Sequence, residues 1–361
     1  MKLLLLIPSL GSGGAERQLV TLAILFKNKG IDVEFLIYHK DLFYLDILKK
    51  HEIKVNIIEE SNYLDRIIKV RNFIKNYSPN CVISFLETCD FLNCISSISI
   101  GNYKVITTEL SCKSSTFSTL RGRIIGWFRR YSNYIVCNSC NARNIWEKKI
   151  PQYKSQYKVI YNPVILQDIN TEYIYNKNGK FNLVIAASYQ YLKNPIGLIE
   201  AVAKMDINKR KFLRVDWYGR IEVSKGDKKA YNEAYDLINK YNLQDVIFLH
   251  EETKDIANIM NMADAVGLFS HLEGLPNAIC EAMLIGKPII MTRVSDFDIL
   301  VDKNNGFLCD SKDIYTIKYA LESIVSMTED DLIELGLNSR LKAEELFSND
   351  TVLNKWLNLI F

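Results

Sequence analysis

Two glutamates in the last third of the chain have the spacing and the neighbours of a sugar-binding site. Glu273 and Glu281 are separated by seven residues in the segment SHLEGLPNAICEAMLIGKPIIMT, residues 270–292. A loop carboxylate can accept hydrogen bonds from sugar hydroxyls, and a carboxylate on the following helix can bind a ribose diol. Glutamates at this spacing are common by chance, whereas the whole pattern with GLPN and GKPII is specific.

The residues between the two glutamates predict a loop that runs into a helix. Proline suits the first turn of a helix, because its missing N–H is not needed there, and Gly286 suits the end of the helix. The start of the helix favours a diphosphate through its free N–H groups and its dipole. This start comprises Gly274, Leu275, Pro276 and Asn277. Together these are the parts of a site for a nucleotide-sugar.

A second candidate site is the glycine loop PSLGSGGAERQL, residues 8–19, which follows the apolar run KLLLLI. The backbone N–H groups of Gly13 and Gly14 can approach an anion at the start of the next helix. The loop does not match a dinucleotide fingerprint, because Glu16 stands where the third glycine is needed for close packing. A phosphate loop ending in Gly-Lys-Ser/Thr is also absent. A tight turn without a ligand is the alternative, and a nicotinamide-dependent dehydrogenase is the least favoured class.

These motifs lie in a chain that alternates between two patterns. Short runs rich in Val, Ile and Leu are followed by longer segments with apolar residues every three to four positions, such as AERQLVTLAILFKNKG. The runs expected to form buried strands in the first half are KLLLLI, VEFLIYH, VNII, CVISF, KVITT and YIVCN. Those expected in the second half are NLVIAA, FLRVDWYG, VIFLH, AVGLF and KPIIMT. The alternation is typical of strand–helix–strand units in a parallel sheet covered on both faces. It stops in the polar segment 151–180 and then resumes, so we place a linker near Asn162–Pro163.

The sequence therefore predicts an α/β chain of two doubly wound, Rossmann-like domains. The first is expected over 1–163 and the second over 164–340, with the helical end 341–361 packing back toward the first. Ligands of such sheets bind at the carboxyl ends of the strands. A site shared by the two domains is expected in a cleft that both parallel sheets face.

The composition narrows the class of protein further. With 361 residues, 48% of them hydrophobic, the chain is long enough for two cores. Its net charge of +3, from 45 basic and 42 acidic residues, argues against a dedicated nucleic-acid binder. Eight scattered cysteines indicate reduced thiols, and the isolated Cys137–Cys140 pair is more typical of a strand entering a helix than of a zinc site.

The N-terminal leucines do not predict export. The apolar run stops at Pro8, and no A-x-A cleavage site follows it. No later stretch reaches the roughly 18 apolar residues that a membrane span needs. We therefore expect a cytoplasmic protein.

The motifs resemble those of a known enzyme family. E-x7-E in its EGLPN, EAM and GKP context, with a lysine upstream after a strand, resembles the retaining glycosyltransferase family 4 of GT-B fold. GSGGAERQL resembles the glycine loop of the members that build bacterial cell-surface polysaccharides. The segments YNPV, ASYQYLKNP and NGFLCD follow in the same order, so the resemblance spans nearly the whole chain.

The resemblance implies a role for each matching residue. Glu273 would contact the donor sugar near the reacting carbon, and Glu281 the ribose hydroxyls. Lys193 would pair with the diphosphate leaving group, where a fixed cation stabilises the charge that develops as the glycosidic bond breaks. An exposed lysine beside a helix start is the alternative for Lys193. Gly13 and Gly14 would approach the donor phosphates or the acceptor.

Two positions depart from the family pattern. The family usually has an arginine about five residues before the phosphate lysine, and Ser188 stands there, so part of the donor affinity must come from elsewhere. Many members also have a histidine near the acceptor, where this chain reads TTELSC. Glu109 is the residue we expect to serve the acceptor there, and an ordinary carboxylate at a strand end is the alternative.

No metal or other cofactor is expected. Asp296-Phe297-Asp298 matches the Asp-x-Asp string with which another glycosyltransferase fold holds a divalent ion. It comes after the GKPIIMT strand, whereas such a motif belongs within the first nucleotide-binding domain. A loop followed by a helix start is therefore the expected structure.

The stretch RGRIIGWFRR, residues 121–130, mixes arginines with Ile, Trp and Phe. A basic, aromatic-flanked amphipathic helix suits the face of an anionic membrane. Alternatively, the arginines extend to solvent while the apolar residues enter the core. The residues expected to touch the membrane are Arg121, Arg123, Arg129 and Arg130.

The sequence thus predicts a retaining glycosyltransferase, hexosyl or N-acetylhexosaminyl in type, acting on a growing, lipid-linked surface glycan such as O-antigen or capsule. The donor is expected to be a nucleotide-sugar, most simply UDP-linked, and the enzyme to work on the inner face of the plasma membrane. One alternative is a non-catalytic nucleotide-sugar-binding partner of a transferase, and another is a nucleotide-sugar epimerase of the same fold. The particular sugar, hydroxyl and linkage depend on loops that the sequence does not place.

Overall fold

The computed structural model describes residues 1–110, 119–164, 179–222 and 226–361, and these form two α/β units. The first unit comprises Met1–Pro163 together with Ser348–Phe361, and the second comprises Val164–Phe347. The division after 163 coincides with the boundary expected from the sequence, whereas the second unit runs past 340 to the end of its last helix. Part of the expected linker, 165–178, lies outside the described residues.

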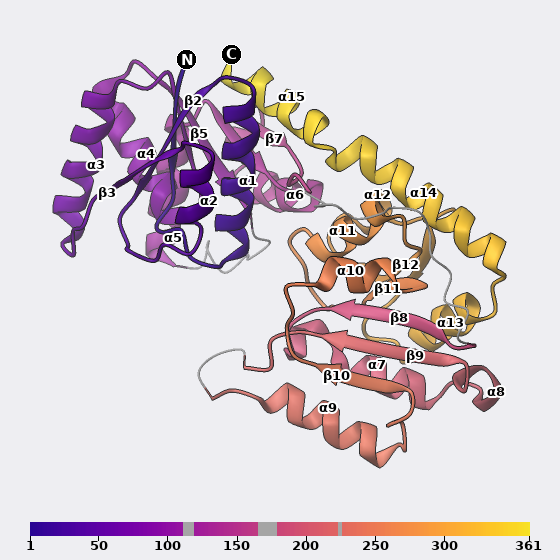
Figure 1. Cartoon of the computed structure of the whole chain (residues 1–361). Helices are drawn as coiled ribbons and strands as arrows, with labels where there is room; N and C mark the ends of the chain where they lie inside the picture. The colour runs from indigo at the N-terminus through magenta and orange to yellow at the C-terminus, as the bar shows by residue number, and fades with distance from the viewer. Residues whose placement is uncertain (111–118, 165–178, 223–225) are drawn as a thin grey trace. The chain divides into compact units, whose positions relative to one another are not determined.

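The first unit is built on a parallel sheet of seven strands in the order β3-β2-β1-β4-β5-β6-β7 (Figure 1). The strands are β1 (Lys2–Leu6), β2 (Asp32–Ile37), β3 (Lys54–Ile57), β4 (Cys81–Ser84), β5 (Lys104–Glu109), β6 (Tyr134–Cys137) and β7 (Tyr157–Val159). The sequence predicted the first six, and it missed β7 because that strand is short and lies in a polar segment. β7 forms by pairing with the edge of β6.

Helices cover both faces of this sheet. The first unit contains α1 (Gly14–Asn28), α2 (Leu45–Lys50), α3 (Tyr63–Tyr77), α4 (Glu87–Ile100), α5 (Leu120–Phe128), α6 (Cys140–Lys149) and α15 (Asn349–Ile360), with short 3-10 helices η2 (Arg129–Tyr131) and η3 (Pro151–Tyr153). Leu3 and Leu5 of β1 enter one core with α1 and α15, while Leu4 and Leu6 enter another with α3 and α4. Because successive residues of a strand point to opposite faces, a strand buried on both faces must be apolar throughout.

The second unit repeats this design with six parallel strands in the order β10-β9-β8-β11-β12-β13. They are β8 (Phe181–Ala186), β9 (Leu213–Tyr218), β10 (Ile247–His250), β11 (Ala265–Leu268), β12 (Ile289–Thr292) and β13 (Gly306–Cys309). The helices are α7 (Pro195–Ala203), α8 (Ile207–Arg210), α9 (Lys229–Lys240), α10 (Ile256–Asn261), α11 (Asn277–Ile285), α12 (Phe297–Leu300), α13 (Ile314–Val325) and α14 (Glu329–Phe347), with the 3-10 helix η4 (Tyr191–Lys193).

The last helix of the chain, α15, belongs to the first unit. Val352, Leu353, Trp356 and Ile360 are buried in the core that contains α1, and Figure 1 shows the two helices side by side. The expectation that the chain end packs toward the first domain agrees with this arrangement, although the return begins at Ser348.

Candidate active site

The central strands of the second sheet place Lys193 and Glu273 at the same edge. The strand order reverses between β8 and β11, and the crevice at the carboxyl ends of such strands is where doubly wound sheets bind ligands. Lys193 ends η4 just after β8, and Glu273 lies in the loop between β11 and α11. The backbone N–H of His271 donates to the carbonyl of Leu192 over 2.8 Å, which joins the two loops.

Glu273 is held by two donors. Nζ of Lys193 and Oγ of Ser270 each lie 2.6 Å from Oε1 of Glu273. Ser270 is fully buried, and its carbonyl accepts a hydrogen bond from Oγ1 of Thr292 over 2.7 Å. The side chains of Lys193 and Glu273 keep 21% and 11% exposure. An ion pair with this access to solvent is weak enough for an anionic ligand to compete for the lysine.

Helix α11 forms as the sequence predicts. It begins at Asn277 directly after Pro276, and Gly286 ends it with φ 87°, a left-handed conformation that favours glycine. Glu281 lies on the helix a little over one turn from its start and is half-buried. Gly274 and Leu275 precede the helix, Leu275 is buried, and the hydroxyl of Ser295 donates to the carbonyl of Gly274. The two glutamates and the helix start therefore belong to one continuous loop–helix segment.

A recess of about 350 Å³ lies at the carboxyl ends of β8, β9 and β10. Ser188 lines it, and so does Arg220 from the loop after β9. A Cβ at Gly219 would overlap the carbonyl of Ala187, so glycine is needed for the two loops to approach this closely. Nε of Arg220 lies 3.5 Å from a carboxylate oxygen of Glu252, and both side chains are exposed. A cation thus shares the recess with Ser188.

Sequence reasoning did not identify Ser270 or Arg220. A serine three residues before a loop glutamate is a weak signal, because serine is common in loops. Arg220 joins the recess only when β9 pairs with β8, and the chain between Ser188 and Arg220 offers no motif that links them.

The glycine loop of the first unit has its own carboxylate at the helix start. Gly13 is the residue before α1 and Gly14 its first residue. The carboxylate of Glu16 lies where a Cβ on Gly13 would stand, while the space beside Gly14 is open. Because Glu16 is in the first turn of α1, its charge favours the positive end of the helix dipole. A second anion bound at Gly13 would be repelled by this carboxylate.

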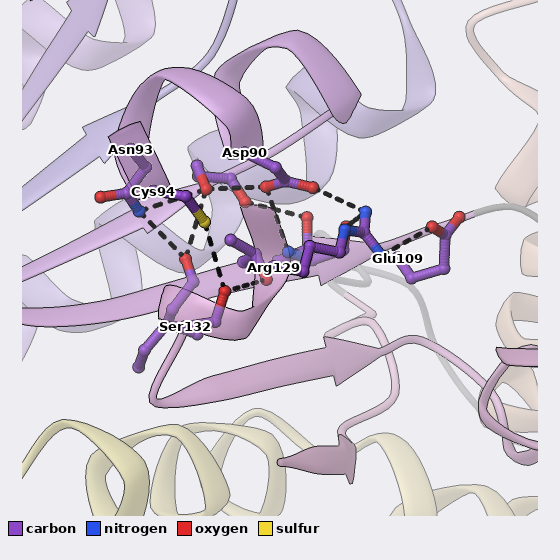
Figure 2. Close-up of polar contacts among 10 residues, drawn as sticks. Asp90, Asn93, Cys94, Glu109, Arg129 and Ser132 are labelled. Carbon is purple, nitrogen blue, oxygen red and sulfur yellow. Dashed lines mark hydrogen bonds and ion pairs between the residues drawn. The ribbon is translucent and has the colours of Figure 1, made fainter. Parts of the chain in front are cut away.

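The structure corrects the prediction that Arg129 faces a membrane. Its side chain is 1% exposed and lies between two carboxylates, as Figure 2 shows: Nη2 is 2.8 Å from Oδ2 of Asp90, and Nη1 is 3.2 Å from Oε2 of Glu109. The guanidinium also covers the ring of Trp146, 4.1 Å from its centroid. The predicted surface role fails because η2 turns this arginine inward from the end of α5.

Burial perturbs the charges of this cluster. It raises the pKa of Asp90 to about 7, although Arg129 and a hydrogen bond from Ser84 oppose the shift. Burial by itself would lower the pKa of Arg129, but Asp90 and Glu109 outweigh it and raise this pKa. The arginine therefore stays charged, and Glu109 supplies part of its counter-charge.

The structure also places two other predicted features, the Cys137–Cys140 pair and the Asp296–Asp298 string. Cys137 ends β6 and Cys140 begins α6, and neither cysteine is in a disulfide. Asp296 precedes α12, so the Asp-Phe-Asp string is a loop and a helix start. In the described residues no three His, Cys, Asp or Glu side chains are grouped to hold a metal ion. No helix within the described ranges has the length and apolarity to span a bilayer.

The second unit is similar to a known family of proteins. Residues 170–337 match the family model described as glycosyl transferases group 1, a match centred on the second unit. The chain is 24% identical to an α-1,4-N-acetyl-D-galactosaminyltransferase of Campylobacter jejuni, which acts on a GalNAc-containing diphosphoundecaprenol glycan. That alignment covers 100% of this chain and 98% of the relative.

Two further similarities complete the comparison. An Escherichia coli enzyme named UDP-Gal:α-D-GlcNAc-diphosphoundecaprenol α-1,3-galactosyltransferase is 30% identical, over 30% of this chain and 28% of the relative. The crystal structure of Anabaena Alr3699/HepE in complex with UDP superimposes with a TM-score of 0.86 at 18% identity, covering 99% of each chain. The chain thus has the GT-B fold, and residues 170–337 match the glycosyl transferases group 1 model.

Proposed function

We propose that the protein is a retaining glycosyltransferase of family 4 that transfers a sugar from a UDP-sugar to a hydroxyl of a lipid-linked surface glycan. The observation that carries this proposal is the Lys193–Glu273 pair at the reversal of the second sheet, next to the start of α11. A cation, a loop carboxylate and a helix N-terminus are the groups that a sugar diphosphate requires.

In the proposed reaction the donor diphosphate displaces Glu273 from Lys193. Lys193 then stabilises the negative charge that develops as the bond between the sugar C1 and the diphosphate oxygen breaks. The acceptor oxygen bonds to C1 on the same face, and its proton passes to the departing diphosphate. Glu273, released from the lysine but still bonded to Ser270, orients the sugar, and Glu281 binds the ribose hydroxyls. The reaction uses positioning and electrostatics, without a protein nucleophile.

The donor and acceptor classes draw support from the relatives. UDP is part of the Escherichia coli enzyme's name, and it is the ligand of the Anabaena structure. The names of the Escherichia coli and Campylobacter jejuni enzymes both contain a diphosphoundecaprenol acceptor. A hexosyl or N-acetylhexosaminyl group is the proposed cargo. No metal is part of this mechanism, so EDTA is expected to leave the activity unchanged.

A lipid-linked acceptor requires access to a membrane, and we propose α5 as the surface that contacts it. Leu120, Ile124, Trp127 and Tyr131 recur at helical spacing and are exposed, Leu120 to 76% and Trp127 to 50%. The first three align on one face of α5, and Tyr131 follows in η2. Exposed arginines accompany this apolar stripe, and they suit anionic headgroups: Arg121, Arg123 and Arg130. This surface suits the inner face of the plasma membrane.

The proposal is tested by a binding and transfer screen of UDP-sugars with K193M and E273Q. Each variant is expected to lower kcat/KM for transfer by roughly 10²–10³-fold, the usual effect of removing a transition-state contact. K318M is the matched control, because Lys318 forms a similar half-buried pair with Glu322 elsewhere in the second unit. Wild-type activity in E273Q would overturn the site.

Binding without transfer would favour the non-catalytic partner that Ser188 suggests. Interconversion of the sugar while it stays linked to UDP would favour the epimerase.

A further inference from the structure

The first sheet contains a second polar site that the proposed donor chemistry does not use. Asp90, Arg129 and Glu109 come from α4, η2 and the end of β5, and their side chains are 0%, 1% and 6% exposed. Removing three charged groups from water is unfavourable unless they are closely paired, so clusters of this kind concentrate at functional sites. This Asp90–Arg129–Glu109 cluster lies beside β4 and β5, near the reversal of strand order between β1 and β4.

A small recess opens next to the cluster. Its volume is about 60 Å³, and it is lined by Leu86, Glu87, Thr108, Glu109, Leu110 and Arg129. At about 30 Å³ per water molecule, it holds about two waters and is too small for a sugar ring. A hydroxymethyl group fits that space.

The backbone beside the recess is strained. Leu86 has φ 75° and ψ 146°, a region that residues other than glycine rarely adopt. It precedes the first turn of α4, whose leading N–H groups have no partner inside the helix. Strain of this type persists where the surrounding structure enforces it, commonly at ligand sites.

The recess is lined by both hydrogen-bond donors and hydrogen-bond acceptors. Among the described residues, Nε and Nη1 of Arg129 meet no hydrogen-bond acceptor in good geometry, although the side chain is 1% exposed. Glu109 supplies carboxylate oxygens, and the start of α4 supplies N–H donors. A hydroxyl group both donates and accepts, so it can satisfy a carboxylate and an N–H together. A purely anionic ligand would instead face the carboxylates of Glu87 and Glu109.

We propose that this recess binds a hydroxymethyl arm of the acceptor sugar, with Glu109 accepting its hydroxyl hydrogen bond and Arg129 acting as the positioning residue for Glu109. The inference deepens the proposed transferase function, because it assigns the acceptor's contact on the first unit.

Arg129 suits the positioning role because Nη2 is hydrogen-bonded to Asp90 while Nη1 forms an ion pair with Glu109. Asp90 fixes Nη2 and is itself fixed by the hydroxyl of Ser84 over 2.7 Å and the amide of Thr108 over 3.3 Å. The other side of the guanidinium faces Glu109, as Figure 2 shows. A planar guanidinium can engage two carboxylates in a fixed geometry, whereas a lysine ammonium is a single flexible point charge. Asp90 therefore orients Arg129, and Arg129 orients Glu109.

The test measures sugar binding by saturation-transfer NMR with two probes, methyl α-N-acetylgalactosaminide and its 6-deoxy analogue, and needs no donor. The wild type is expected to bind the first probe and to bind the 6-deoxy analogue at least 10-fold more weakly. E109Q is expected to weaken binding of the first probe about 10- to 100-fold, the loss of one charge-assisted hydrogen bond. R129K is expected to weaken it similarly, although Glu109 remains.

Two controls separate this role from a structural one. E34Q removes a half-buried glutamate that pairs with Lys54 in the same sheet, away from the recess, and is expected to bind the probe as the wild type does. E109Q keeps the Asp90–Arg129 pair, so its Tm is expected to stay near that of the wild type even if R129K unfolds. Unchanged binding in E109Q, equal binding of the two probes, or no binding by the wild type would each overturn the proposal.

Failure of this inference is distinguishable from failure of the proposed function. If the transferase assignment is wrong, UDP-sugar binding and its dependence on Lys193 are absent, whatever the probes do. If only the recess is wrong, E109Q transfers sugar with an unchanged KM for the acceptor.

Discussion

Each of the two units places an ion pair near the carboxyl edge of its parallel sheet, and the two pairs are built for different purposes. In the first unit Arg129 is 1% exposed and lies between two carboxylates. In the second, Lys193 is 21% exposed and meets a single carboxylate, Glu273. A fully buried arginine holds its partners in one geometry, whereas a lysine with access to solvent can exchange its partner for a ligand. The difference in burial therefore separates a fully buried contact from one that keeps access to solvent.

The two sheets share the strand order around that edge, but the two pairs follow strands at different positions in it, β5 in the first sheet and β8 in the second. After β5 the chain reaches η2 through α5, and η2 directs Arg129 into the interior. After β8 it makes only the single turn of η4, which ends at Lys193 near the surface. The two units have similar folds, and they differ in how segments far apart in the sequence pack around one arginine.

The largest expected effect on the free energy of unfolding comes from removing the buried Arg129. R129M leaves Asp90 and Glu109 buried without a cation, which is expected to destabilise the first unit by about 3–5 kcal/mol. The corresponding change in the second unit, K193M, is expected to lower the free energy of unfolding by less than about 1 kcal/mol. Urea unfolding of the two variants measures the difference. An equal loss of unfolding free energy in the two variants would contradict the distinction between a fully buried pair and an exchangeable pair.

The next largest effect is expected on the pH dependence of stability, and it comes from Lys287. This lysine of the second unit is fully buried. Burial lowers its pKa to about 8, with Asp264 opposing the shift. The unfolded lysine titrates near 10.4, so between these pH values the unfolded state binds more protons and stability rises with pH. The gain is expected to reach up to about 3 kcal/mol between about pH 8 and pH 10.4.

K287M is the comparison for this pH series, because the variant lacks the titrating group. Thermal unfolding of both proteins between pH 7.5 and pH 10.5, roughly the window set by the two pKa values, measures the difference. Parallel curves for the two proteins would show that Lys287 does not contribute.

A smaller effect is expected from the serine that holds Glu273. S270A removes the 2.6 Å hydrogen bond to Oε1 and is expected to lower kcat/KM for transfer by about tenfold, close to 1.4 kcal/mol. S323A is the control, since that hydroxyl bonds only within α13 to the carbonyl of Tyr319. Full activity in S270A would mean that Lys193 alone orients Glu273.

The smallest effect on stability is expected at α5. Replacing Ile124 and Trp127 by serine changes exposed side chains, so the free energy of unfolding is expected to move within about 0.5 kcal/mol. Flotation with vesicles containing phosphatidylglycerol is nevertheless expected to be lost. K148Q/K149Q in α6 is the matched control for exposed positive charge. Flotation that persists without Ile124 and Trp127 would contradict the assignment of this surface.

Much of the fold could be predicted from the sequence, for identifiable reasons. β1 is predictable because each of its leucines is buried on one face or the other, which leaves a continuous apolar run. α11 is predictable because Pro276 and Gly286 are chemically suited to its two ends. β7 and β13 were not predicted, since short edge strands depend on a neighbour for their hydrogen bonds.

The candidate site likewise contains residues that the sequence could predict and residues that it could not. Glu273 and Glu281 carry a motif whose spacing is local, and from it the sequence by itself predicted that they belong, with Lys193, to a nucleotide-sugar site. The sequence could not distinguish Arg129 from its neighbour Arg130, because both continue the same basic, aromatic stretch.

Only the tertiary structure decided that Arg129 is buried against Asp90 and Glu109 while Arg130 stays exposed. It also decided that Ser270 bonds to Glu273 and that Glu16 lies over Gly13. A local motif is determined by the geometry of a few consecutive residues. The partner of a buried charge is determined by which distant strands and helices meet around it, and that depends on the packing of the whole unit.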